Sequence, residues 1–343
     1  MRVLWEAVIF ISFFKIYICD ISYIQTMSGI IRFAPSPTGY LHEGHLLSAL
    51  YVWAASQKWD LKVHLRIEDH DQSRARPAYI EGIREDLAWL GFRYDSESIQ
   101  SARTAIYETA LRKLEAKSLV YPCYCSRKQL LAENPQSETG EIIYQGKCYY
   151  RRQPYKASDA TNAVGHGRAE WLGQERSDCP KTSDESAPHN LRFIVPDKFI
   201  NWHDLRLGDF HENPKLQCGD FPIRDREGQW TYQFAVCVDD IDENITHIVR
   251  GEDIRNSTAR QIALMEALGR TEPPIYLHHP LIVDKNNKKL SKRELAHSLR
   301  QDKEAGITPE TLFGRVCFKA HLTESNAPIS LQEAIALVLP TFD

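Results

Sequence analysis

The sequence predicts an α/β fold organised around a doubly wound, parallel sheet. Short apolar runs that suit buried strands alternate along the chain with amphipathic stretches at helical spacing, which is the pattern that parallel pairing requires. Polar and charged residues follow several of these runs, and open α/β sheets bind their ligands at the carboxyl ends of their strands. A turn with two prolines and a glycine joins the first strand to the first helix, which is typical of a nucleotide site.

Length and composition limit the class of protein. The chain has 343 residues, of which 43% are hydrophobic, so it can build one large domain or two modest ones. The formal net charge of −4 argues against a generally basic nucleic-acid coat, and any RNA contact needs a local basic surface. Eight cysteines without a convincing export signal indicate a reducing compartment, so we expect a cytoplasmic protein.

Residues 1–26 are apolar and aromatic-rich, but three charged residues interrupt them: Glu6, Lys15 and Asp20. The longest nearly apolar run, 7–14, is too short to span a bilayer, and no small-residue cleavage site follows it. We therefore expect no membrane association. We interpret 1–26 as a mis-called extension and Met27 as the true start.

The first strand and helix are predicted to build a nucleotide site. Residues 30–33 suit a buried strand, and the turn that follows excludes a helix until about Leu41. His42 and His45 fall near the start of this helix, where unpaired N–H groups and the helix dipole favour phosphate. Gly44 between them allows a nucleotide to approach the backbone. Two histidines at a helix start are also ordinary polar caps, so partners elsewhere must decide.

The second strand, 61–67, alternates apolar and polar residues and ends in the acidic run 68–71. Carboxylates therefore gather at the ligand edge of the sheet, although acidic residues in a solvated loop are the alternative. Two amphipathic helices follow as scaffold, one ending at Gly91 and one over about 106–114.

Three cysteines nominate a structural zinc site. Cys123, Cys125 and Cys148 lie within 26 residues, thiolate is a ligand that zinc prefers, and four ligands close a structural tetrahedron. Buried, unreactive cysteines are the alternative. The fourth ligand stays open among four residues: Tyr144, His166, Cys179 and His189.

The second half of the chain adds two predicted strands. The alternation of apolar residues over 230–238 predicts one of them, in which Tyr232 counts as core. Residues 245–249 predict the other, with Arg250 at its ligand end unless it is a free surface arginine. A helix that ends at Gly269 then leads to a lysine-rich loop, which on its own would be solvated.

These ordered motifs resemble those of class I aminoacyl-tRNA synthetases, in the glutamyl branch. The string R-F-A-P-S-P-T-G-Y-L-H-E-G-H is similar to their first nucleotide motif, and R-I-E-D-H-D is similar to R-I-E-D-T-D. Y-Q-F-A-V-C-V-D-D is similar to the family's Y-Q-x-A-x-V-x-D-D, and V-R-G-E-D is similar to V-R-G-x-D. K-L-S-K-R stands where the family has K-M-S-K-S or K-L-S-K-x. The resemblance covers roughly 30–293.

The resemblance implies a Rossmann-type doubly wound catalytic domain with an inserted zinc-bearing subdomain and no anticodon-binding domain, for which about fifty remaining residues are too few. The expected divisions are 1–26 as an extension, 27–120 as the first half of the nucleotide-binding domain, 121–218 as the inserted subdomain with a flexible loop at 157–188, 219–294 as the second half, and 295–343 as a short C-terminal region.

The resemblance also assigns a glutamate site. The residues expected to contact glutamate are Arg32, Phe33, Ala34, Pro35, Ser36, Glu68, Tyr232 and Arg250. Glu68 would face the amino group, and Arg250 would fork onto the side-chain carboxylate, which a lysine could not do. In the related zinc element a tyrosine completes the shell, which makes Tyr144 the fourth ligand beside Cys123, Cys125 and Cys148.

Nucleotide chemistry is assigned to the two class I motifs. The residues expected to bind ATP are His42, Gly44, His45 and Lys292. The residues expected to act in catalysis are His42, His45, Lys289 and Lys292, with the two lysines meeting the charge on the transferring phosphorus. Arg293 departs from the family pattern, and its role stays open.

Among family members, the truncated glutamyl-queuosine tRNA(Asp) synthetases are the closest match. This implies ATP- and Mg²⁺-dependent activation of L-glutamate without tRNA, transfer to the queuosine base of tRNA(Asp), a structural Zn²⁺ in each chain and a monomer. The alternatives are a truncated glutamyl-tRNA synthetase that charges a 3′ end, or an inactive tRNA-binding regulator, which the intact motifs disfavour. A zinc-stabilised adenylyltransferase is disfavoured by the glutamate-shaped constellation.

Overall fold

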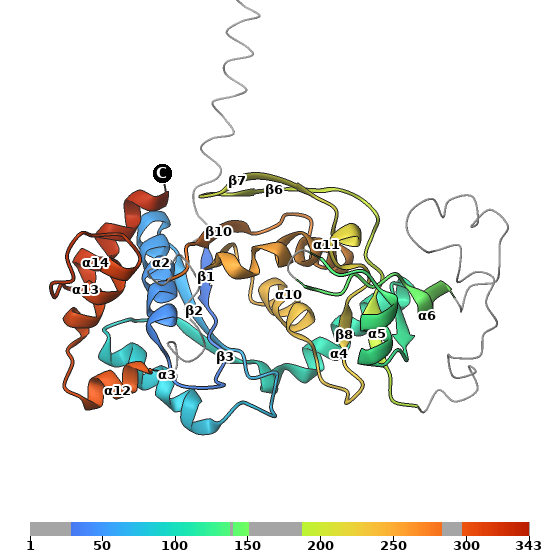
Figure 1. The fold of residues 1–343 in the computed structure, drawn as a ribbon, viewed down its shortest axis with the longest axis horizontal. Coiled ribbons are helices and arrows are strands. Elements are labelled where there is room, and N and C mark those ends of the chain that lie inside the picture. Colours follow the sequence, from blue (N-terminus) through green and yellow to red (C-terminus); the bar gives the residue numbers. More distant parts are fainter. Residues whose placement is uncertain (1–28, 138–139, 151–186, 283–296, 343) are drawn as a thin grey trace, which may run out of the picture.

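A seven-stranded sheet runs through the middle of the molecule (Figure 1). The structure, a computed structural model, describes residues 29–137, 140–150, 187–282 and 297–342. The sheet has the strand order β3-β2-β1-β9-β10-β6-β7. Its strands are β1 Ile30–Phe33, β2 Lys62–Ile67, β3 Ser96–Ile99, β6 Ile200–Asp204, β7 Gly208–Glu212, β9 His247–Gly251 and β10 Ile275–His279.

The order of the strands creates a switch point beside β1. All neighbours pair in parallel except β6 and β7, which form an antiparallel hairpin. The chain runs outward from β1 to β3 and later returns to β9 on the other side of β1. Ligands bind at the carboxyl ends of the strands where the order reverses in this way. The predicted doubly wound parallel sheet is confirmed.

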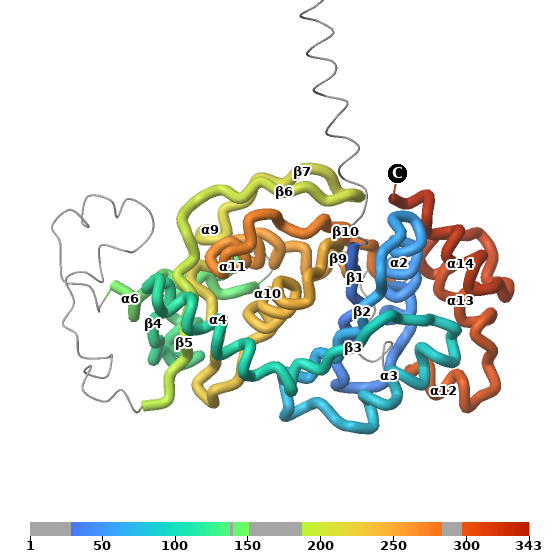
Figure 2. Tube along the Cα trace, turned by 180° about the vertical axis from the view of Figure 1, so that it is seen from behind, coloured from blue at the N-terminus to red at the C-terminus, as the bar shows by residue number. Residues whose placement is uncertain are grey.

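Helices surround this sheet, and those nearest the C-terminus lie at one end of the molecule (Figure 2). The longer ones are α2 Glu43–Trp59, α3 Pro77–Trp89, α4 Thr104–Ala116, α10 Tyr232–Asp242, α11 Thr258–Leu268, α13 Pro309–Lys319 and α14 Leu331–Val338. Shorter helical segments are η1 Gln100–Arg103, α9 Pro214–Cys218, η2 Glu252–Ser257, α12 Leu299–Glu304 and η3 Leu339–Phe342.

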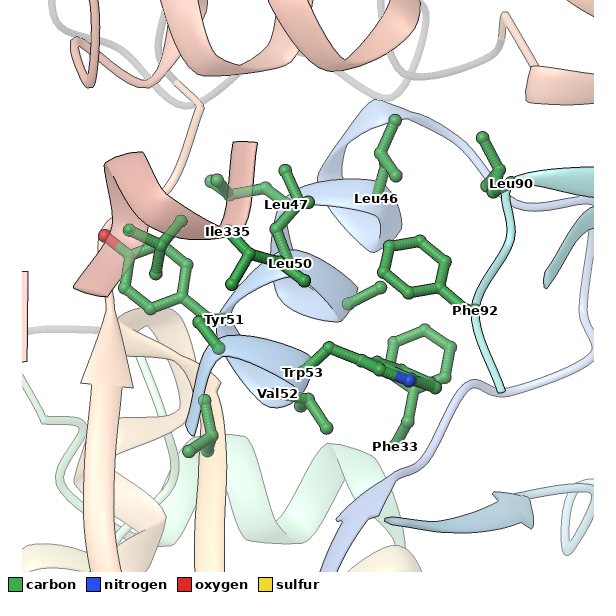
Figure 3. Close-up of a cluster of buried hydrophobic side chains, with 14 of the residues drawn as sticks. Phe33, Leu46, Leu47, Leu50, Tyr51, Val52, Trp53, Leu90, Phe92 and Ile335 are labelled. Carbon is green, nitrogen blue, oxygen red and sulfur yellow. The ribbon is translucent and has the colours of Figure 1, made fainter. Parts of the chain in front are cut away.

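The helix α2 is the centre of the larger core. It packs against β1, β2 and β9 on one side and against α13 and α14 on the other. Trp53 lies between Phe33 and Phe92, with ring centroids at 5.6 and 4.6 Å (Figure 3). The side chains of Leu47 and Leu50 lie beside Ile335 of α14 (Figure 3). Residues after 297 therefore complete the core behind the first nucleotide motif.

The predicted strand at 230–238 is wrong, because this segment forms the helix α10. Its even-numbered residues are large and apolar, which produced the alternation, but the odd positions Ala235 and Cys237 are small and also buried. A helix that is buried on all sides is apolar all round, so its sequence can imitate a strand. Both predicted scaffold helices and the helix that ends at Gly269 are confirmed as α3, α4 and α11.

A small antiparallel sheet lies at one end of the molecule (Figure 1). It consists of β4 Val120–Cys123, β5 Asn190–Phe193 and β8 Pro222–Arg224, next to α5 Arg127–Glu133 and α6 Lys147–Tyr150. The hairpin β6–β7 falls within the expected insertion 121–218 but joins the main sheet through β10, whereas β8 follows the insertion and joins the small sheet. The expected extension 1–26 lies outside the described residues, as does nearly all of the expected loop 157–188.

Among the residues that the structure describes, no helix combines the length and the apolar character needed to cross a membrane.

A buried network of charges ties α10 to the first two strands. Arg66 on β2 is fully buried, and its guanidinium donates to Asp240 at 2.7 Å and to Glu243 at 2.8 Å. Arg32 on β1 donates to the same Asp240 oxygen at 3.0 Å. Pairing offsets the cost of burying these charges, because an unpaired one would carry its full desolvation cost.

We expect the Arg66→Met substitution to destabilise the fold by about 3–5 kcal/mol, because it removes one partner of a buried pair and leaves carboxylates behind. The matched control is Arg84→Met, whose guanidinium bonds Glu97 at the surface with 30% of the side chain exposed. The control should lose less than about 1 kcal/mol. Urea-induced unfolding followed by circular dichroism measures both, and equal losses would contradict the assignment.

Candidate functional site

A cavity of about 1020 Å³ opens where the strand order reverses. A smaller one of about 90 Å³ shares much of its lining and adds Arg32 and Phe33. Both receive residues from the carboxyl ends of β1, β2 and β9. The predicted glutamate and ATP residues that line one or both cavities are Arg32, Phe33, Ala34, Pro35, Ser36, His42, His45, Glu68, Tyr232 and Arg250. These ten predicted residues therefore meet in one place, from segments far apart in the sequence, whereas Gly44 lines neither cavity.

The two histidines of the first motif cap the helix α2 reciprocally. The backbone N–H of Gly44 donates to Nδ1 of His42 at 3.1 Å, and the backbone N–H of His42 donates to Nδ1 of His45 at 3.2 Å. The expectation that these N–H groups await phosphate is therefore corrected, because the imidazoles already accept from them. The two histidines are therefore polar caps of α2, and they also line the larger cavity, where a nucleotide could bind.

This capping fixes where the ring protons sit. A neutral imidazole that accepts at Nδ1 carries its proton on Nε2 and donates there. Burial, with His42 nearby, lowers the pKa of His45 to about 3, so its ring is neutral. Both rings line the larger cavity, with their centroids 3.9 Å apart. His45 thus presents a neutral N–H donor beside His42 at the start of α2, where a phosphate oxygen could accept from it.

Glu68 contributes a buried carboxylate with one oxygen that lacks a hydrogen-bond partner in the described part of the chain. The side chain is almost fully buried, and its Oε1 has no hydrogen-bond partner among the described residues. The nearest cation is Nη1 of Arg66, at 3.9 Å. Burial raises the pKa of Glu68 to about 7, outweighing the opposite effects of Arg66 and Arg32. A ligand ammonium group at this point would stabilise the ionised form.

Arg250 contributes a buried cation whose hydrogen-bond partners among the described residues are neutral. Its Nε donates to Nε2 of His278 at 2.9 Å. Its Nη1 donates to Oε1 of Gln261 at 2.7 Å, and its Nη2 donates to Oγ1 of Thr258 at 2.8 Å. A guanidinium has five N–H donors, so these bonds orient it and leave further donors for a planar carboxylate. The arrangement suits an anionic ligand group.

Two predicted glutamate contacts have structural partners of their own. Arg32 is buried and bonded to Asp240, and Phe33 packs edge-on against Trp53. Both border the smaller cavity, where they form its walls. Tyr232 stands at the first turn of α10, and burial raises its pKa to about 12, so its hydroxyl stays protonated. It can therefore donate to a ligand oxygen.

Sequence reasoning missed the residues that hold Arg250. His278 lies on β10, a strand that the sequence analysis did not identify, and Thr258 and Gln261 lie on α11. The sequence feature that could have indicated His278 is the pair His278-His279, two polar residues in an otherwise apolar stretch. Lys289, Lys292 and Arg293 lie outside the described residues, so their placement stays a prediction.

The three predicted cysteines come together in the small subdomain. Their sulfur atoms all lie within 4.8 Å of one another, and all three residues are buried. The hydroxyl oxygen of Tyr144 lies 3.5 Å from Sγ of Cys123 and 3.7 Å from Sγ of Cys125. Thiol donors from Cys125 and Cys148 lower the pKa of Cys123. The donor set fits a thiophilic metal ion.

The surroundings of the cysteines support this fit. The guanidinium of buried Arg192 lies 4.0 Å from the ring centre of Tyr144 and can balance negative thiolates. Of the rival ligands, His189 bonds instead to the carbonyl oxygen of Ala187 at 2.9 Å. His166 and Cys179 lie outside the described residues.

Comparisons with known proteins identify the family of this chain. Residues 30–336 match the family described as class I tRNA synthetases (E and Q), catalytic domain. A relative named glutamyl-Q tRNA(Asp) synthetase from Symbiobacterium thermophilum is 36% identical over 91% of this chain and 91% of its own length. A second with this name, from Burkholderia mallei, is 39% identical over 78% of this chain and 82% of its own length.

Longer relatives match over the same region. A glutamate–tRNA ligase from Hydrogenobaculum sp. is 34% identical, and this chain spans 61% of its length. The solved glutamate-tRNA synthetase of Elizabethkingia anophelis is 27% identical, with a TM-score of 0.66 over 90% of this chain and 65% of that one. With a matched region that includes both cavities, the chain belongs to the class I tRNA synthetases for glutamate and glutamine and carries their catalytic domain.

Proposed function

We propose that this chain activates L-glutamate with ATP and transfers it to the queuosine base of tRNA(Asp). The observation that carries the proposal is one cavity with an unsatisfied buried carboxylate, Glu68, and a buried guanidinium with neutral partners, Arg250. Relatives named for this reaction match the chain over most of their own length, which supports the acceptor.

The cavity would select glutamate through its two charged ends. Glu68 would receive the α-ammonium group, and Arg250 would hold the side-chain carboxylate with two parallel bonds. Each charge-assisted contact contributes about 1.5–3 kcal/mol. An amide in place of the carboxylate would lose one of them, which favours glutamate over glutamine by about 10-fold to 100-fold. The Tyr232 hydroxyl would help to hold the amino acid.

Adenylate formation would follow from the first motif. The Nε2 proton of His45 would bond a phosphate oxygen, with His42 and Gly44 beside it at the start of α2. Lys289 and Lys292 are proposed to meet the charge that develops on the α-phosphorus. An oxygen of the α-carboxylate attacks that phosphorus in line, and pyrophosphate leaves with the bonding electrons. Mg²⁺ bound with ATP would supply further charge neutralisation.

Transfer would use the same cavity. A hydroxyl of the queuosine base attacks the carbonyl carbon of the glutamyl adenylate, AMP leaves, and an ester forms on the base. The second candidate is charging of a tRNA 3′ end, which the match to glutamate–tRNA ligases favours. The two candidates share activation and differ in the acceptor.

We expect glutamate-dependent exchange of pyrophosphate into ATP without tRNA, followed by transfer of labelled glutamate to queuosine-containing tRNA(Asp). The controls are tRNA(Asp) with guanosine at that position and fully modified tRNA(Glu). Label on the 3′ end of tRNA(Glu) would support the second candidate. Both enzymatic candidates are wrong if no exchange occurs without tRNA and none occurs after addition of either form of tRNA(Asp) or of tRNA(Glu).

The affinity for glutamate should fall as the pH drops below about 7, because Glu68 has its pKa raised to about 7 and must be ionised to bind an ammonium group. Protonation then competes with the ligand, so kcat/KM for glutamate should drop by up to about tenfold per pH unit. Exchange measured from about pH 5.5 to 8.5 checks this.

The Glu68→Gln variant should lose this pH limb and raise the KM for glutamate most above about pH 7, with the difference shrinking at lower pH, where Glu68 is itself neutral. The matched control is Glu81→Gln on the exposed face of α3, which should keep the profile of the unsubstituted protein. A limb that persists unchanged in Glu68→Gln would assign the titration to another group.

The cysteine cluster should hold about one zinc ion per chain, because Cys123, Cys125, Cys148 and Tyr144 supply four donors. Cys123→Ser should lose the metal and lower the melting temperature by several degrees. The control is Cys317→Ser, a buried cysteine of α13, which should keep the metal. Metal analysis of freshly purified protein and thermal unfolding measure both. If the unsubstituted chain holds no metal and Cys123→Ser keeps its melting temperature, the three cysteines are core residues and not metal ligands.

A further inference from the structure

We infer that His278, oriented by Asp204, is a positioning residue that fixes Arg250 for the side-chain carboxylate and thereby sets the preference for glutamate over glutamine. The inference rests on the proposed function, since it takes glutamate as the ligand of Arg250. Neither His278 nor Asp204 belongs to a motif that the sequence analysis identified, and neither lines the cavities.

The bonds around His278 define its tautomer. The residue is fully buried on β10, and its Nδ1 lies 2.6 Å from Oδ2 of Asp204. Its Nε2 lies 2.9 Å from Nε of Arg250. The guanidinium nitrogen can only donate, so Nε2 of the imidazole accepts and the ring proton sits on Nδ1, facing the carboxylate. Asp204, His278 and Arg250 thus form a chain of two hydrogen bonds.

Asp204 is held rigidly at the far end of this chain. Its Oδ2 also accepts from the backbone N–H of His278 at 3.0 Å. Its Oδ1 accepts from the backbone N–H groups of Arg206 and Leu207, at 3.0 and 2.9 Å. Although burial acts to raise it, the bond from His278 and these backbone bonds hold the pKa of Asp204 below its usual range. Asp204 is therefore an ionised anchor at the end of β6, just before the β6–β7 turn.

Other buried arginines near the cavity are neutralised differently. Arg32 and Arg66 donate directly to the carboxylate of Asp240. A carboxylate bonded directly to Arg250 would occupy donors that a ligand needs and would cancel its charge. The imidazole instead keeps the negative charge of Asp204 one ring away from Arg250. The compensating charge remains close enough to stabilise a buried cation, yet the ligand-facing donors stay available.

A second neutral acceptor shows the same design. Gln261 presents its oxygen to Arg250, while its nitrogen donates to Oε1 of Gln233 at 2.8 Å. Gln233 in turn donates to Oγ of Ser257 at 2.9 Å. This chain fixes which end of the Gln261 amide faces the guanidinium. Arg250 is thus oriented from two sides by groups that are themselves oriented.

A pair of variants separates the two bonds of His278. His278→Asn can still donate to Asp204 but is too short to accept from Arg250. His278→Gln can bring its oxygen to the position of Nε2 but gives up the bond to Asp204. We expect His278→Asn to raise the KM for glutamate by about 10-fold to 100-fold, with kcat and the KM for ATP within about threefold. The kcat/KM ratio of glutamate over glutamine should fall by a similar factor, whereas His278→Gln should retain most of it.

The matched control is His279→Asn, at the next position of the same strand, where the ring stacks on Tyr51 with centroids 5.0 Å apart. This variant also removes a buried imidazole from β10 but should keep the glutamate-to-glutamine ratio. Thr258→Val removes another neutral acceptor of Arg250 and should reduce that ratio even if His278→Asn fails to fold.

The outcomes distinguish this inference from the proposed function. No glutamate-dependent exchange by the unsubstituted chain would overturn the proposed function and the inference together. Exchange by the unsubstituted chain, with an unchanged ratio in the folded His278→Asn or in Thr258→Val, would overturn the inference alone. An equal loss of the ratio in His279→Asn would also overturn it, since a general disturbance of β10 would then be the cause.

Discussion

The ligand edge of the sheet depends on one buried carboxylate, that of Asp240. A single oxygen of Asp240 accepts from Arg32 on β1 and from Arg66 on β2. Burial acts to raise the pKa of Asp240, but the two cations hold it below its usual range. Because Asp240 lies on α10, the pair fixes this helix against the strands that lead to Ala34 and Glu68. The positions of Ala34 and Glu68 beside the cavities thus depend on the ion pairs of Asp240. Asp240 itself does not need to touch a ligand.

The same edge contains charges that the protein leaves for a ligand. Glu68 has a carboxylate oxygen without a hydrogen-bond partner among the described residues, and Arg250 is bonded to neutral groups. Burying either charge is unfavourable in the empty state, so each gains from a ligand of opposite sign. A ligand with an ammonium group and a separate carboxylate satisfies both. Glutamate has this composition, together with a second carboxylate that can react.

The motifs and their local structure could be predicted from the sequence. The helix α10 and the contacts between distant segments could not. The strand–turn–helix at β1 and α2 was predictable because proline, glycine and helical spacing act locally. The helix α10 was not, because tertiary burial on all sides makes its sequence apolar at odd and even positions alike. The pair of Asp204 and His278 joins residues that are 74 positions apart. Such a contact depends on β10 pairing with β6, which no local pattern encodes.

The cysteine cluster is connected to the amino-acid site through the small sheet. The backbone N–H of Tyr144 donates to the carbonyl oxygen of Cys218 at 3.2 Å. Gly219, which follows Cys218, lies against the backbone of Tyr144. A Cβ at Gly219 would stand 1.9 Å from the carbonyl oxygen of Tyr144, so only glycine fits.

From this contact the chain continues into β8, whose carbonyl oxygens at Pro222 and Ile223 accept from Thr231, the residue before α10. The first turn of α10 then carries Tyr232, which borders the cavity, and Gln233, which orients Gln261 and through it Arg250. A metal ion in the cluster would therefore stabilise the start of α10 without approaching the reacting atoms. The cysteine cluster and the residues that orient Arg250 are thus linked by the Tyr144–Cys218 bond, by the chain from Gly219 to β8, and by the bonds from Thr231 to β8.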